Sequence, residues 1–335
     1  MRTIERLAAA AILALAAGAC TEDADDAAED GGADTEADAG ADAGTDGGTA
    51  DPITCADFAE GWNEGFAVDG LPRGFFLDLP EGVDEGGPWP VVFSWKGIYN
   101  DVVEYRGKIA ALVDNETMPF IGVTPEDSDY TLLGTVLTDW QVEDADPETN
   151  REARLFDEIL ACLDERWGVD PDHVHSIGMS LGAIVTDMLG VVRGDAIASI
   201  ATYSGAYGSN PALQDDWPSM LASLVSWPAL DHDNTYTQLF LYGGDEDVYT
   251  WDEGGGAEIP FNLSTPHDVE YLNGLGRDAV LCNHGQGHEI PGDQYDAVNI
   301  VAFFAAHPLG TYESPYADGL PASFPDTCAF SPSAE

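Results

Sequence analysis

The segment Ser176-Ile177-Gly178-Met179-Ser180-Leu181-Gly182 constrains the fold of this 335-residue chain more than any other. An extended stretch at 172–175 precedes it, and residues 183–189 have the character of a helix. A strand, a tight turn and a helix in this order leave little room around the turn, so residues without side chains are needed at Gly178 and Gly182. This geometry exposes the Ser180 hydroxyl at the end of a sheet and aims the next helix at it. The segment therefore predicts a serine nucleophile.

Strand-like and helix-like segments alternate on both sides of this turn. Expected strands cover residues 74–80, 89–95, 119–124, 197–204, 237–242 and 278–282. No further strand is expected after residue 282. Expected helices cover residues 102–113, 149–167 and 293–306. The alternation predicts an α/β fold with a mostly parallel central sheet flanked by helices. The irregular stretch 208–235 is expected to cover the site as a lid.

The first nineteen residues have the pattern of an export signal. Arg2 and Arg6 precede an apolar run at 7–17 that is too short to span a bilayer. Residues 17–19 suit an ordinary secretory cleavage site, whereas Cys20 directly after them resembles the lipidated cysteine of a bacterial lipoprotein. We favour lipidation, which predicts an exported outer-membrane or cell-surface lipoprotein; the alternative is a secreted or periplasmic protein.

Residues 20–51 are expected to form an acidic, disordered linker. Beyond Cys20 they contain only Ala, Asp, Glu, Gly and Thr, so they cannot bury apolar surface to offset the entropy of ordering. Like charges keep such a segment extended. Residues 52–335 are long enough for one large catalytic domain.

Acidic residues dominate the chain, whose formal net charge is −51. Residues 52–335 alone hold 49 acidic and 9 basic residues, a net charge of about −40. Such a charge disfavours binding to nucleic acid or anionic lipid, so the only membrane contact expected is a lipid on Cys20. Either adaptation to high salt or a general compositional bias would explain the acidity. No obligate protein partner is indicated.

Five cysteines occur, and four remain if Cys20 is lipidated. An even number of cysteines in an exported protein predicts two disulfides among Cys55, Cys162, Cys282 and Cys328. Three pairings are open. We favour Cys55 with Cys328, because these two bracket the domain.

A serine is a weak nucleophile until a base lies within hydrogen-bond reach and a third group orients that base. The segment after the strand at 237–242 offers an acid, for which Asp247 is favoured over Asp245 and Glu246 because it lies further out on the loop. The segment after the strand at 278–282 offers His288, favoured over His284, which stays near the strand end.

A metal site at the two histidines is disfavoured. Their four-residue spacing suits zinc only on a helix, and Gly285 and Gly287 argue against a helix there. No third ligand is evident nearby. We expect no metal and no cofactor.

Two backbone N–H groups should stabilise an oxyanion beside Ser180. One is that of Leu181, and the other comes from the loop after residues 89–95, with Ile98 favoured over Gly97. The aromatic residues Trp140, Tyr207 and Trp251 are weaker candidates for a substrate pocket.

These residues together resemble the secreted α/β-hydrolase esterases grouped with polyhydroxybutyrate depolymerases, feruloyl esterases and acetylxylan esterases. The resemblance is carried by residues 90–98, Trp140, residues 169–170, 178–182, 244–248 and 287–288. It implies an α/β-hydrolase fold with Ser180, Asp247 and His288 as the triad and Leu181 and Ile98 as oxyanion donors.

The resemblance implies a two-step hydrolysis of small-molecule or polymeric carboxylic esters. Such enzymes usually have His-Gly where this chain has Lys96-Gly97, which leaves the substrate class open. One alternative is a serine peptidase of the same fold, which would need a large gating domain for which this chain has no room. Another is a non-catalytic surface protein that binds polysaccharide, whose binding would survive Ser180→Ala.

Overall fold

The structure is a computed structural model that describes residues 53–334 except 133–134, 144–145, 147, 226, 230–235, 252–255, 293–294 and 312. The predicted export signal at 1–19, Cys20 and the linker at 20–51 lie outside the described residues. None of the helices that the structure describes has the length and apolar character needed to cross a bilayer.

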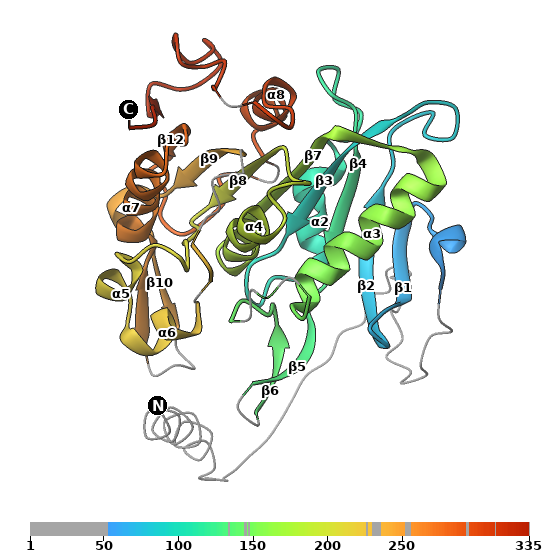
Figure 1. Ribbon diagram of the computed structural model, residues 1–335, viewed down its shortest axis with the longest axis horizontal. Helices are drawn as coiled ribbons and strands as arrows, with labels where there is room; N and C mark the ends of the chain where they lie inside the picture. Colours follow the sequence, from blue (N-terminus) through green and yellow to red (C-terminus); the bar gives the residue numbers. More distant parts are fainter. Residues whose placement is uncertain are drawn as a thin grey trace, which may run out of the picture.

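A nine-stranded sheet organises the described chain (Figure 1). In spatial order its strands are β1 (Gly61–Val68), β2 (Leu71–Asp78), β4 (Ile121–Pro125), β3 (Trp89–Trp95), β7 (Val169–Met179), β8 (Ser199–Tyr203), β9 (Thr237–Tyr242), β12 (Ala279–Asn283) and β13 (Cys328–Ser331). The strands from β4 to β12 run parallel, while β1, β2 and β13 are antiparallel additions at the two edges. The predicted mostly parallel sheet is thus confirmed.

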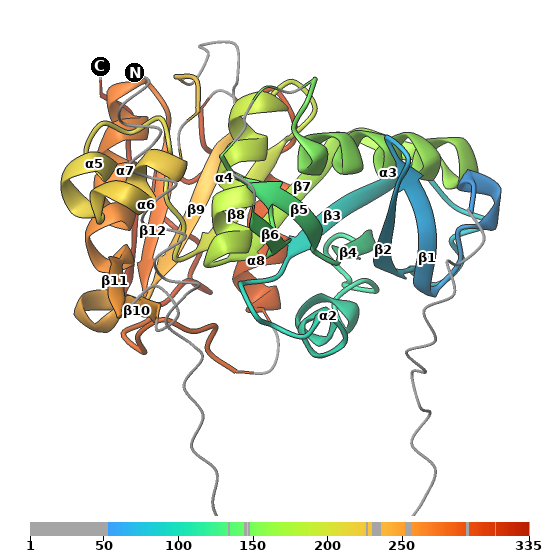
Figure 2. The ribbon, with the colours of Figure 1, turned by 90° about the horizontal axis from the view of Figure 1, so that it is seen from below.

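Helices cover both faces of this sheet (Figures 1 and 2). The longer helices are α2 (Val102–Ala110), α3 (Arg151–Trp167), α4 (Leu181–Val192), α7 (Phe261–Gly274) and α8 (Ala297–Ala306). Residues of α3, α4 and α7 share one buried apolar cluster, and residues of α2 and α8 share a second one on the opposite face. The parallel strands are therefore buried on both sides, as their apolar runs require.

Local sequence explains where α3 begins and ends. The Asn150 side chain accepts hydrogen bonds from the N–H groups of Glu152 and Ala153, which caps the helix N-terminus. Gly168 ends the helix with a φ of 76°, a conformation that glycine adopts without strain. The apolar face, with Leu155, Phe156 and Ile159, packs on the sheet.

Two hairpins and two short helices lie near the lower edge of Figure 1. They are β5 (Ser128–Leu132) with β6 (Thr135–Asp139), β10 (Val248–Trp251) with β11 (Ala257–Pro260), and α5 (Leu213–Asp216) and α6 (Ser219–Leu224). The remaining elements are the 3₁₀ turns η1 (Cys55–Asp57) and η2 (Gly244–Glu246). The helices α5 and α6 fall within the stretch expected to form a lid.

The two predicted disulfides are present, but the favoured pairing of Cys55 with Cys328 is wrong. Cys55 bonds to Cys162, because η1 packs against α3, and Cys282 bonds to Cys328. The second bond follows from β13, a strand absent from the expected set, which pairs with β12 and sets Cys328 directly opposite Cys282. The expected strand at 278–282 is therefore not the final one.

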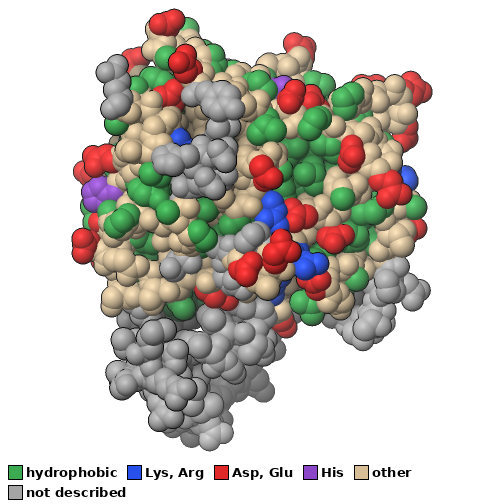
Figure 3. Space-filling view, in the orientation of Figure 1, with side chains coloured by type: hydrophobic (Ala, Val, Ile, Leu, Met, Phe, Trp, Pro, Cys, Tyr) green, Lys and Arg blue, Asp and Glu red, His purple; other side chains and the backbone are tan. Residues whose placement is uncertain are grey.

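Figure 3 shows acidic side chains spread over the visible face of the molecule, with few lysines and arginines among them. Several of the basic residues are paired with acids, as in the bonds of Arg154 to Asp69 and of Arg193 to Asp157. The excess charge is therefore carried by the folded domain, and on the face shown it is spread over many separate positions.

Candidate active site

Ser180 lies at the sharp turn between β7 and α4. Its φ of 54° and ψ of −121° are strained for a residue with a side chain. A Cβ on Gly178 would lie 2.1 Å from the carbonyl oxygen of Gly182, and a Cβ on Gly182 would lie 2.1 Å from that of Trp95. Both glycines are thus required by close backbone contacts, as the sequence predicts. The turn holds the Ser180 side chain at the carboxyl edge of the sheet.

Asp247 follows β9 and is completely buried. Its Oδ2 accepts hydrogen bonds from the Gly243 N–H at 2.9 Å and from the Ser204 hydroxyl at 2.7 Å. Asp245 and Glu246, the alternative acids, are exposed. Of the three consecutive acids, Asp247 is the one whose carboxylate binds His288.

His288 lies on the loop after β12 and connects Asp247 to Ser180. Its Nδ1 lies 2.8 Å from Oδ1 of Asp247, and its Nε2 lies 3.0 Å from Oγ of Ser180. A carboxylate only accepts hydrogen bonds, so Nδ1 carries the proton and Nε2 is free to accept the serine hydroxyl proton. The ring stacks on Phe261 with centroids 4.7 Å apart, and only 11% of the side chain is exposed.

The loops that carry the acid and the histidine touch each other. The Gly287 N–H donates to the Gly243 carbonyl at 3.2 Å, and a Cβ on Gly243 would lie 1.9 Å from the Gly287 carbonyl oxygen. This contact sets the distance between Asp247 and His288. His284 points elsewhere: its ring lies 6.2 Å from that of Tyr203, and burial lowers its pKa.

The two expected donors border the same space as Ser180. Leu181 is the first residue of α4, so its N–H has no partner within the helix. Ile98 lines the cavity that contains Ser180 and Leu181, and a Cβ on Gly97 would lie 3.4 Å from that of Ser180. The loop after β3 therefore lies directly beside the serine.

The Lys96 ammonium is bound by an acid on the loop after β4. Its Nζ pairs with Oδ2 of Asp127 at 2.7 Å and lies 5.7 Å from the ring centroid of Trp140. Its carbonyl accepts a hydrogen bond from the indole Nε1 of Trp140 at 2.8 Å. Both ends of Lys96 are therefore held by residues that flank the β5–β6 hairpin.

An apolar cavity of about 220 Å³ opens at Ser180. Trp140 and Trp251, two of the three predicted pocket residues, line it. Further lining residues are Ile98, Tyr99, Asp139, Val142, Glu143, Leu181, Ile184, Trp217, Leu221, Leu224, Val225, Tyr249, Ile259 and Phe261. Leu221 and Leu224 of α6, together with Trp217 and Val225 on either side of that helix, form part of the wall, within the stretch 208–235 that was expected to cover the site.

The prediction for Tyr207 is wrong. This residue is fully buried in the core, where its hydroxyl bonds to Gln238 at 2.5 Å and to the hydroxyl of Tyr236 at 2.7 Å. Sequence alone did not separate a buried aromatic residue from one that lines a pocket.

A second hollow, of about 260 Å³, is bordered by His288. Its walls are more polar and come from α2, the loop before α2 and the histidine loop. Its lining residues are Asn100, Asp101, Glu104, Tyr105, Lys108, Met179, His288, Glu289 and Ile290. Within the described ranges, no group of three or more His, Cys, Asp or Glu residues could hold a metal ion.

Three site residues were missed by sequence reasoning. Ser204 supports Asp247, Phe261 stacks on His288, and Asp127 binds Lys96. Ser204 had a usable signal, because it ends the strand expected next to that of Ser180 and so belongs to the same carboxyl edge. Phe261 and Asp127 had none, since they lie in segments to which the sequence assigned neither a helix nor a strand.

Comparison with known proteins agrees with this architecture. No family model matches the chain. Feruloyl esterase D of Neurospora crassa is 22% identical over 156 residues, which are 44% of this chain and 51% of that protein. The chain thus spans about half the length of the curated relative it matches.

Solved structures match over more of the chain. The native structure of pOPH superposes with a TM-score of 0.62 at 17% identity, covering 84% of this chain and 97% of that one. A ferulic acid esterase from Anaeromyces mucronatus, solved with ferulic acid, superposes with a TM-score of 0.50 at 17% identity, covering 74% and 90%. The chain therefore has the α/β-hydrolase fold.

Proposed function

We propose that this protein hydrolyses carboxylic esters through an acyl-enzyme formed on Ser180. The observation that carries the proposal is the unbroken series of hydrogen bonds from Ser180 through His288 to the buried Asp247, at the mouth of an apolar cavity. The fold and the feruloyl esterase relative point to the same reaction class.

In the first step, Nε2 of His288 takes the Ser180 proton as Oγ attacks the ester carbonyl carbon. The carbonyl oxygen becomes an oxyanion that the N–H groups of Leu181 and Ile98 stabilise. Asp247 keeps the imidazole oriented and stabilises its positive charge. When the carbon–oxygen bond breaks, His288 gives its proton to the alcohol that leaves.

In the second step, His288 removes a proton from water as the water attacks the acyl-enzyme. The intermediate collapses, the proton returns to Oγ of Ser180, and the carboxylic acid leaves. No cofactor takes part in either step.

The two hollows suggest which side each half of the ester occupies. The leaving alcohol must receive its proton from His288, so it lies toward the polar hollow that His288 borders. The acyl group then lies in the apolar cavity beside Ser180, Leu181 and Ile98. Natural substrates would be feruloyl-type esters, whose aromatic acyl group suits the aromatic walls of the acyl cavity, or polyester chains like those of polyhydroxybutyrate.

We also propose that the protein is exported and anchored through a lipid on Cys20. Two disulfides suit an oxidising compartment, and the acidic linker would hold the catalytic domain away from the membrane. Incorporation of labelled palmitate that is lost in Cys20→Ser would support anchoring. Release of unlabelled protein into the medium would contradict it.

The proposed reaction is tested with p-nitrophenyl butyrate and the full chain, comparing wild type with Ser180→Ala. Loss of at least about a thousandfold in kcat is expected in a variant with unchanged circular dichroism. A fluorophosphonate should add to wild type at Ser180 and not to Ser180→Ala. A folded wild type that neither hydrolyses esters nor reacts with the fluorophosphonate would refute the proposal.

A further inference from the structure

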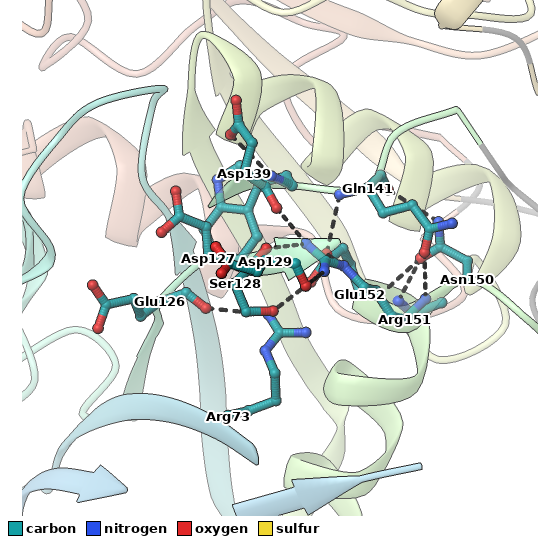
Figure 4. A network of polar contacts seen from close by, with 12 residues as sticks. Arg73, Glu126, Asp127, Ser128, Asp129, Asp139, Gln141, Asn150, Arg151 and Glu152 are labelled. Atoms are coloured by element: carbon teal, nitrogen blue, oxygen red, sulfur yellow. Dashed lines mark hydrogen bonds and ion pairs between the residues drawn. The ribbon is translucent and has the colours of Figure 1, made fainter. Parts of the chain in front are cut away.

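A buried charged cluster fixes the base of the β5–β6 hairpin beside the apolar cavity. The Arg151 guanidinium donates to the carbonyls of Ser128 at 2.7 Å, of Asp129 at 2.9 Å and of Asp139 (Figure 4). Ser128 and Asp139 are the paired residues that open and close the hairpin. One arginine therefore holds both strands where they join the rest of the fold.

Glu152 holds this arginine in place. Its carboxylate binds Nε of Arg151 at 2.7 Å and Nη2 of Arg73 at 2.8 Å, and none of the three side chains is more than 10% exposed. Loss of any one of these three side chains would leave an uncompensated buried charge, so each of them holds the other two in position. The Asp139 backbone is thereby anchored to α3.

The Asp139 side chain points the other way, into the cavity that contains Ser180. Figure 4 shows its carboxyl directed away from Arg151, and the residue lines the cavity wall. Oδ1 accepts one hydrogen bond, from the Trp140 N–H at 2.9 Å. In the part of the chain that the structure describes, Oδ2 receives no hydrogen bond. Oδ2 of Asp139 is therefore available to hydrogen bond with a molecule bound in this mainly apolar cavity.

The surroundings make this carboxyl easy to protonate. Burial raises the pKa of Asp139 to about 7, and the negative charge of Asp127 adds to the rise, against the Trp140 N–H and Lys96, which lower it. The charged or titratable groups around it are Lys96 and Asp127 from the loops after β3 and β4, Glu152 from α3, and Tyr99, Glu143 and Tyr249 from the cavity wall. Arg151 lies on the backbone side, bound to the Asp139 carbonyl.

Resting on the proposed function, we propose that Asp139 determines acyl specificity by hydrogen bonding to a neutral polar group on the acyl chain and rejecting acyl chains that end in a carboxylate. A hydroxyl donates to an ionised carboxyl and accepts from a protonated one, so it pairs with both states. A substrate carboxylate can accept from the protonated state only and is repelled by the ionised state at short range in a poorly solvated cavity. Rejection should therefore strengthen as the pH rises through the range in which Asp139 ionises.

The test uses three p-nitrophenyl esters that differ in one acyl substituent. They are the esters of 3-(4-methylphenyl)-, 3-(4-hydroxyphenyl)- and 3-(4-carboxyphenyl)propanoic acid, measured with the full chain at pH 6 and pH 8. The leaving group and the residues that attack the ester and protonate the leaving group are the same for all three esters, so ratios of kcat/KM report on the acyl cavity.

In wild type, the carboxylate-to-methyl ratio should fall several-fold from pH 6 to pH 8, and the hydroxyl ester should be preferred to the methyl ester. In Asp139→Asn, which keeps the shape and removes the charge, the carboxylate-to-methyl ratio at pH 8 should rise about tenfold and lose its pH dependence. Asp139→Ser provides a second, smaller neutral side chain should the first variant fold poorly.

The control is Glu165→Gln, which removes one negative charge from an exposed position on α3. An equal shift in this control would overturn the inference by showing that the general negative field sets the preference. If both Asp139 variants hydrolyse the methyl ester and their carboxylate-to-methyl ratios equal those of wild type, the inference about Asp139 is overturned while the proposed function stands. Absence of hydrolysis of all three esters by folded wild type would overturn the proposed function as well.

Discussion

The Ser204 hydroxyl donates a 2.7 Å hydrogen bond to Oδ2 of Asp247, on the side of the carboxylate opposite to His288. Ser204 follows β8 and Asp247 follows β9, so the bond links the ends of two neighbouring strands. Ser204 has a φ of 57°, which brings its side chain to the acid. The orientation of the acid is thus set by the sheet itself.

Ser204→Ala should lower kcat by about tenfold and leave KM nearly unchanged. The Gly243 N–H still binds Oδ2, so Asp247 stays in place but turns more freely behind His288. Steady-state kinetics on p-nitrophenyl butyrate measures both constants. Ser199→Ala removes a comparable buried hydroxyl that bonds to His175, away from Ser180, and should leave kcat unchanged. Equal kinetics in the two variants would contradict the positioning role.

The Lys96–Asp127 pair should position Ile98, the second oxyanion donor that we propose. Lys96→Met leaves Asp127 unpaired and frees the backbone that leads to Ile98, so kcat should fall by about tenfold or more, with little change in KM. Affinity for a boronic acid that mimics the tetrahedral intermediate should fall in parallel. Lys96→Arg should restore part of both.

Two further variants separate positioning from stability. Lys96→Met with Asp127→Asn removes the pair without leaving a buried charge, so it should recover thermal stability while kcat stays low. Arg193→Met with Asp157→Asn removes an ion pair, with an N–O distance of 2.6 Å, at the far end of α4. If this control lowers kcat as much, Lys96 has no specific role at the site.

His307 should make the fold sensitive to acid. Its Nδ1 lies 2.8 Å from the Phe303 carbonyl and its Nε2 2.7 Å from the Ser314 hydroxyl, and burial lowers its pKa from 6.5 to about 4. A lowered folded-state pKa means that its stabilisation is full above pH 6.5 and is lost as the pH falls toward 4. The difference in unfolding free energy between wild type and His307→Gln should shrink by about 3 kcal/mol between pH 7 and pH 4. Urea unfolding at several pH values measures it, and a constant difference would contradict the prediction.

Salt should stabilise the folded domain if its acidity reflects adaptation to salt. About forty uncompensated negative charges repel one another, and added ions screen them. The midpoint of thermal unfolding should rise strongly between 0.1 and about 1 M NaCl. Sucrose of matched osmolality, which does not screen charge, is the control. A midpoint that does not respond to NaCl would leave compositional bias as the explanation.

The strands at 89–95 and 237–242 were predicted at their observed bounds, because apolar runs buried on both faces have a distinctive pattern. The hairpins β5–β6 and β10–β11 were not expected, nor were α7 and β13. Their stability comes from distant partners, such as Arg151 for β5–β6 and β12 for β13. Local sequence carries little signal for elements of that kind.

The chain's sequence by itself determined the turn at Ser180, since only glycine fits at 178 and 182, and it determined the order of the serine, acid and histidine segments along parallel strands. The tertiary structure decided which of three adjacent acids faces the histidine, which cysteines pair, and that Asp139 enters the cavity while Tyr207 does not. Close packing of backbone is a local requirement that residue type records directly. Which partner a side chain finds depends instead on segments that are far apart in the sequence and meet only in the folded sheet. The type of a residue carries no information about which distant segment will lie beside it.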